Sequence, residues 1–238
     1  MKFDLVTVPA KEMSFTEHLE ELRHRIFKIL LAIAVGLMVS YGFIDAIVGF
    51  VTDPAGKLYY MRPAEAFFIY LKLGIVAGCL IASPIIFYQL WAFLMPAFSV
   101  KQNLWVLGIT CLSLLLFFSG LLFSYYLVLP LGLAFFTGFG AGEIEALISM
   151  ENYIDFFMML LLPFGFIFEM PLVLVVGAVL GIISSSSLKR IRPYVILMSF
   201  FLAALLTPPD VISQVLLALP MLLLYELSIL FIRYILQN

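Results

Sequence analysis

The chain has 238 residues, of which 64% are apolar and 12% are charged, and its mean hydropathy is +1.16. A soluble domain of this length needs far more polar surface, so the composition indicates an integral membrane protein. The formal charge is only −2 and no basic stripe is present, which argues against nucleic-acid binding, and two cysteines within apolar runs give no disulfide framework.

The first 25 residues are predicted to form a cytoplasmic arm that ends in an amphipathic helix. Ser14 or Thr16 can cap this helix, and Glu17 follows Ser14 at the spacing of a capping box. Its apolar stripe is expected to lie on the membrane surface and lead into the first span. The other face is either a solvated surface with a Glu21–Arg25 pair or a carboxylate cluster for an arginine-bearing ligand; it carries Glu17, Glu20, Glu21, Arg23, His24 and Arg25.

Six transmembrane helices are predicted between residues 26 and 233, in an all-α fold of one domain. A helix needs about 20 apolar residues to cross the hydrocarbon, and the first run has no cleavage site, so we interpret it as a retained span. The last two segments are short and flank a Thr-Pro-Pro-Asp turn, so they are two spans or one re-entrant hairpin; flanking charges favour two spans. The predicted spans are Ile26–Ile44, Ala66–Leu94, Leu104–Leu129, Ile154–Ile183, Tyr194–Leu206 and Val211–Ile232.

Lysine and arginine positions predict that both chain ends, including a tail at 234–238, lie in the cytoplasm. Loops rich in these residues stay on the cytoplasmic side of a membrane. The alternate loops carry only Lys57 and Arg62. The arm, the 96–103 and 184–193 loops and the end of the last span carry Lys2, Lys11, Arg23, Arg25, Lys28, Lys101, Lys189, Arg190, Arg192 and Arg233.

A single acid, Glu169, lies in the middle of the fourth span, between two prolines. A charged side chain at this depth costs about 2.5–3.5 kcal/mol on insertion scales, so it needs protonation, a polar partner or water. Thr207, Asp210 and Gln214 in and beside the short segments offer polar partners. We expect Glu169 to face a concave, partly wet pocket; the alternative is a protonated structural acid bonded to Gln214.

The sequence contains none of the motifs typical of enzymes or metal sites. It has no HExxH sequence, no phosphate-binding glycine loop and no Ser-His-Asp set, so we expect no catalysis, cofactor or metal. A proton-coupled small-molecule transporter that uses Glu169 is the alternative function. The absence of an inverted repeat argues against that alternative.

Five stretches, in order along nearly the whole chain, resemble TatC, the multispanning component of the twin-arginine protein export system. They are HLEELRHR, ASPIIFYQLWAFLMPAF, FGFIFEMPLVL, RPYV and LLTPPDVISQVLLALPMLLLYE. The resemblance implies a concave, glove-like scaffold of six helices in the inner membrane of a prokaryote. It also implies a non-enzymatic receptor that binds the paired arginines of precursor signal peptides at the cytoplasmic face and works with the proton-motive force.

The resemblance assigns signal-peptide binding to Glu21, Arg23 and Phe93, although one aromatic residue among 24 phenylalanines is more often explained by packing. The family usually has a second glutamate in the first cytoplasmic loop, where this chain has Gln102. A glutamine accepts hydrogen bonds from a guanidinium but supplies no charge. We therefore hypothesise that Glu20 or Glu17 supplies the second charge.

The resemblance also implies partners within the membrane. Glu169, Thr207 and Gln214 match a polar region associated with docking the single-span proteins TatA and TatB, and further TatC copies are expected as partners. Pro54 matches a loop proline that either fixes an external cap or makes an ordinary turn. Asp210 is expected to cap the start of the sixth helix.

Overall fold

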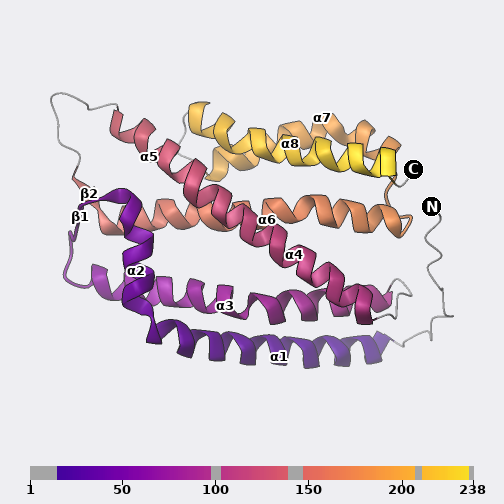
Figure 1. The fold of residues 1–238 in the computed structure, drawn as a ribbon, viewed down its shortest axis with the longest axis horizontal. Coiled ribbons are helices and arrows are strands. Elements are labelled where there is room, and N and C mark those ends of the chain that lie inside the picture. Colours follow the sequence, from indigo (N-terminus) through magenta and orange to yellow (C-terminus); the bar gives the residue numbers. More distant parts are fainter. Residues whose placement is uncertain (1–14, 98–102, 139–146, 207–210, 236–238) are drawn as a thin grey trace. The chain divides into compact units, whose positions relative to one another are not determined.

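The computed structural model describes residues 15–97, 103–138, 147–206 and 211–235, and these are almost entirely helical (Figure 1). The predictions for Gln102, Thr207 and Asp210 fall outside the described residues. The elements are α1 (Phe15–Gly42), α2 (Ile44–Thr52), η1 (Asp53–Ala55), β1 (Leu58–Tyr59), α3 (Glu65–Ala97), α4 (Asn103–Phe123), the π-helical η2 (Ser124–Val128), α5 (Leu129–Gly138), β2 (Ile148–Ser149), α6 (Met150–Val179), α7 (Ser185–Leu206) and α8 (Val211–Ile235).

Within the described ranges, five helices are long and apolar enough to cross a membrane, which confirms the predicted all-α membrane fold. Each of the five contains most of a predicted span, and the predicted span Tyr194–Leu206, which lies in the C-terminal half of α7, is not among them. The third is longer than predicted, because α4, η2 and α5 run on as one helical stretch from Leu104 to Gly138. The arm is continuous with the first span, since α1 runs from Phe15 to Gly42.

The predicted loop at 184–193 is wrong, because α7 already begins at Ser185. The serines start this helix: the hydroxyl oxygen of Ser184 accepts a hydrogen bond from the backbone N–H of Ser187 at 3.2 Å. The first turns of α7 therefore hold the basic residues that the sequence assigned to a loop. Its apolar part is short, as predicted, and α7 and α8 are both shorter than α1, α3 and α6.

The contacts divide the chain into two compact units, the first formed by residues 1–53 and 62–114. In this unit α1 lies along α3 (Figure 1). A Cβ atom added to Gly36 would lie 2.3 Å from the carbonyl oxygen of Gly78, so the two backbones touch where both side chains are absent. Near this contact the Ser40 hydroxyl donates a 2.8 Å hydrogen bond to the carbonyl oxygen of Gly74.

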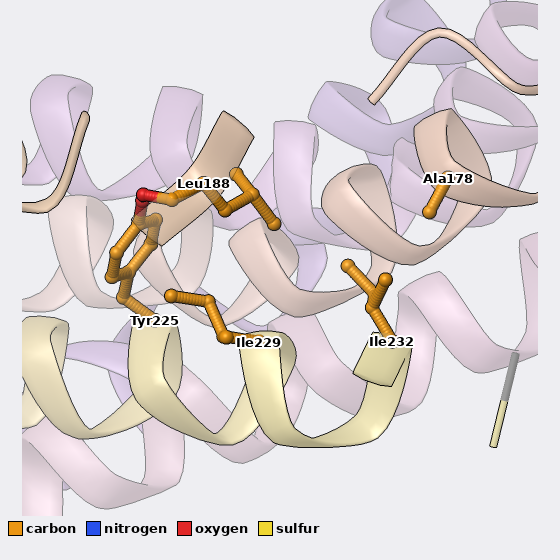
Figure 2. Packing of buried hydrophobic residues seen from close by; sticks show 5 residues of the cluster. All are labelled: Ala178, Leu188, Tyr225, Ile229 and Ile232. Carbon is orange, nitrogen blue, oxygen red and sulfur yellow. The ribbon is translucent and has the colours of Figure 1, made fainter. Parts of the chain in front are cut away.

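The second unit contains residues 54–61 and 115–238. Here β1 pairs in parallel with β2, and Gly120 of α4 approaches the backbone of Phe164 of α6. α6 ends in a Schellman motif: Gly181 has a φ of 74°, and the N–H of Ile182 donates to the carbonyl of Gly177 at 2.9 Å. The turn brings α7 back against α6 and α8, around a cluster of Ala178, Leu188, Tyr225, Ile229 and Ile232 (Figure 2).

The close contact of α1 and α3 predicts that Gly36→Ala destabilises the chain by about 1–3 kcal/mol, because the added methyl group overpacks against backbone that cannot rotate away. Gly108→Ala is the matched control, since a Cβ atom there meets no atom within 4 Å. Thermal unfolding in detergent measures both variants. Equal melting temperatures for the two would contradict this role for Gly36.

Candidate functional site

A polar cluster joins the start of α1 to the second half of α3 in the first unit. The Nε and Nη2 atoms of Arg25 donate to Oε1 of Glu21 at 3.0 and 2.5 Å, which confirms the pair predicted from their spacing. The third guanidinium nitrogen, Nη1, donates to the amide oxygen of Gln89 at 3.1 Å. The helical spacing of four residues puts Glu21 and Arg25 on one face, and Gln89 holds that face against α3.

Two rings complete this cluster, which we call the Glu21 cluster: His18, Glu21, Arg25, Gln89 and Phe93. The imidazole of His18 stacks on the ring of Phe93, with centroids 4.5 Å apart and planes 15° apart. Its Nδ1 lies 3.9 Å from Oε2 of Glu21, beyond hydrogen-bond distance. Oε2 is buried and has no hydrogen-bond partner among the described residues, although Oε1 has two bonds.

The structure separates the acidic residues of the arm that the sequence grouped together. Glu17, Glu20 and Arg23 are exposed, whereas Glu21 is half-buried. Sequence reasoning missed Gln89, although an amide within a long apolar run is itself a signal, because a buried amide needs hydrogen-bond partners. It also gave no role to His18, whose place beside Phe93 depends on the packing of α1 against α3.

The candidate intramembrane site lies in the second unit. Glu169 is 8% exposed within α6, so its side chain faces the protein interior. Gln214 on α8 is half-buried, and its amide nitrogen donates to the carbonyl oxygen of Phe200 on α7 at 2.9 Å. This bond ties α7 to α8 at the level where the sequence predicts a polar region.

The partly wet pocket predicted around Glu169 does not match the cavity found between α6, α7 and α8. This cavity of about 520 Å³ has an apolar lining, and Glu169 is not among its lining residues. The lining includes Met170, Leu174, Tyr194, Met198, Met221 and Tyr225. Because the neighbouring Met170 points into the cavity, Glu169 on the same helix lies on a different face.

Two further contacts concern the predicted ends of the spans. Pro54 lies in η1 and lines a cavity of about 320 Å³ together with Pro130 and Thr137. Arg192 of α7 donates to Glu226 of α8 at 2.6 Å, with both side chains about half exposed. An exposed pair of this kind contributes about 0–1 kcal/mol, so it adds little to the stability of the helix pair.

The sequence model of one protein family, described as Sec-independent protein translocase protein (TatC), matches residues 17–220. The chain belongs to the TatC family. A TatC from Desulforapulum autotrophicum is 41% identical over 90% of this chain and 82% of its own length. The TatC of Aquifex aeolicus is 38% identical over 91% of this chain and 93% of its own length.

Solved structures agree with this assignment. A crystal structure of a twin-arginine translocase receptor, TatC, in the detergent DDM has a TM-score of 0.84 and 37% identity, and covers 91% of this chain and 99% of its own. The chain is therefore a multi-pass membrane protein of a translocase family that is not enzymatic. Membership in this family favours protein translocation over the alternative of a small-molecule transporter.

The Glu21 cluster predicts different roles for two nearby arginines. Arg25→Met should destabilise the chain by about 1–3 kcal/mol, because it leaves a half-buried carboxylate without its two charge-assisted hydrogen bonds. Arg23→Met should change stability by less than about 0.5 kcal/mol, since Arg23 is exposed. Thermal unfolding in detergent tests this, and a larger effect at Arg23 would contradict it.

Proposed function

We propose that this chain is the receptor core of a twin-arginine translocase in the inner membrane of a prokaryote. It binds the signal peptides of folded precursors at the cytoplasmic face through the Glu21 cluster. It then docks single-span partners of the TatA and TatB type, and further copies of itself, for export driven by the proton-motive force. The observation that carries this proposal is the carboxylate of Glu21: one oxygen has no hydrogen-bond partner among the described residues and lies 3.9 Å from the imidazole of His18, which stacks on Phe93.

The chemistry of the Glu21 cluster suits an arginine ligand. A guanidinium is planar, always charged and rich in donors, so it prefers a carboxylate together with an aromatic face. Both groups are present, and Glu17 and Glu20 are exposed on the same arm, where they add negative charge for the second arginine. Arg23 and Gln102 are proposed to take part in signal-peptide binding on the strength of family membership alone.

The proposed docking site for single-span partners is the polar region of Glu169, Thr207 and Gln214. A partner helix that carries a polar residue at membrane depth would find hydrogen-bond partners there, and such pairs contribute about 0.6–2 kcal/mol in membranes. The amide nitrogen of Gln214 holds the carbonyl oxygen of Phe200, and its amide oxygen is proposed to accept a hydrogen bond from the partner helix. Pro54 and Asp210 are proposed to be structural, in the external cap and at the start of α8.

Peptide binding to the purified chain in detergent tests the cytoplasmic site. A labelled twin-arginine peptide should bind in a salt-sensitive manner, and Glu21→Gln should weaken it about ten- to hundredfold through the loss of a charge-assisted hydrogen bond. Replacing both peptide arginines by lysine should weaken binding to a similar degree, because lysine lacks the planar fork. If Glu20 supplies the second charge, Glu20→Gln should weaken binding nearly as much as Glu21→Gln.

The matched control is Asp45→Asn, which removes one negative charge from an exposed position on α2, on the predicted external side. It should leave the affinity unchanged. Equal affinity of the chain for the arginine and lysine peptides would refute specific recognition at Glu21. An equal loss of affinity in Asp45→Asn and Glu21→Gln would refute it as well. Unchanged affinity in Glu20→Gln would rule out only the role of Glu20.

Photo-crosslinking tests the proposed docking site. A crosslinker at position 214, in membranes that contain the single-span partners, should capture a partner span. A crosslinker at Leu115, which is 69% exposed on α4, serves as the control for random encounters in the bilayer. Equal capture at the two positions would show that Gln214 marks no specific site.

A further inference from the structure

The position of His18 carries an inference about how the Glu21 cluster selects its ligand. This side chain meets the two groups that an arginine ligand would need. Its ring stacks on that of Phe93 with centroids 4.5 Å apart. Its Nδ1 atom lies 3.9 Å from Oε2 of Glu21, the oxygen that has no hydrogen-bond partner among the described residues. An imidazole is planar and carries ring nitrogens at its edge, so it has the shape of a guanidinium but fewer donors.

We infer that His18 occupies the arginine subsite of the resting chain and is displaced when an arginine side chain of the signal peptide binds. This inference rests on the proposed function and adds to it a residue that sets affinity and specificity. The guanidinium would take the place of the imidazole on Phe93 and donate to Oε2 of Glu21. Arg25 stays in place, because it occupies Oε1 and leaves the second oxygen for the ligand.

Burial and distance explain why His18 is the group that moves. Oε2 of Glu21 is buried, so a ligand reaches it only when a neighbouring side chain moves away. His18 is 37% exposed and lies in the first turns of α1, whereas Arg25 is 19% exposed and holds three hydrogen bonds. The imidazole makes no hydrogen bond to Oε2 at 3.9 Å, so, among the described residues of this cluster, displacing it breaks the stacking contact with Phe93 and no hydrogen bond.

Two substitutions at position 18 should change peptide affinity in opposite directions. His18→Ala empties the subsite and should tighten binding of the twin-arginine peptide by about two- to tenfold, the equivalent of one aromatic stacking contact. His18→Arg should weaken binding at least tenfold, since a tethered guanidinium competes for both Phe93 and Glu21. A purely structural histidine would weaken binding in both variants, and that result would overturn the inference.

The control variant is His24→Ala. The ring of His24 is bonded to the backbone oxygen of Glu20 on the exposed side of α1, so its loss should leave affinity unchanged. The lysine form of the peptide should gain little from His18→Ala, because an ammonium group does not stack in place of the imidazole. An equal gain for both peptides, or an equal gain in His24→Ala, would overturn the inference.

The outcomes keep this inference separate from the proposed function. If the unaltered chain fails to bind the twin-arginine peptide, the proposed function is refuted. If the unaltered chain binds and His18→Ala does not tighten binding, the proposed function stands and the role of His18 is refuted. Melting temperatures of both variants show whether either has lost its fold, and His18→Arg gives an independent answer if His18→Ala does not fold.

Discussion

The cost of removing a polar group from water governs where this chain places its charges. In hydrocarbon each such group needs a partner inside the protein, and three polar side chains of the described helices find theirs on a neighbouring helix. Ser40 bonds to α3, Trp91 donates to Ser113 at 3.0 Å, and Gln214 bonds to α7. These bonds align neighbouring helices, because each can form only in one register.

The Glu21 cluster shows the same constraint at the end of a helix. Arg25 neutralises the carboxylate and Gln89 satisfies the remaining guanidinium nitrogen, so a charged pair can lie half-buried against α3. The hydrogen bonding of the Glu21 carboxylate is incomplete. Its second oxygen, Oε2, lies near the imidazole of His18 but accepts no hydrogen bond from the described residues. A buried carboxylate oxygen without a donor is suited to a ligand that supplies one.

Helices in a bilayer lack the hydrophobic driving force that packs soluble domains, so they depend on close van der Waals contact. The glycine contacts of α1 with α3, and of α4 with α6, provide it within each unit. In the second unit the positive φ of Gly181 lets the chain turn sharply after α6, which brings the start of α7 back to the cluster around Tyr225. The serine run then starts α7 earlier than its apolar composition indicates.

The sequence by itself determined the membrane class, the approximate spans and the family, because apolar length and ordered motifs are local properties of the chain. It also predicted the Glu21–Arg25 pair, since a spacing of four residues fixes a contact on any helix. Only the tertiary structure decided that Gln89, Phe93 and His18 complete this cluster, and that Glu169 faces the interior but lines no part of the apolar cavity beside it. Contacts between residues far apart in the sequence depend on how the helices rotate and pack, which no local pattern encodes.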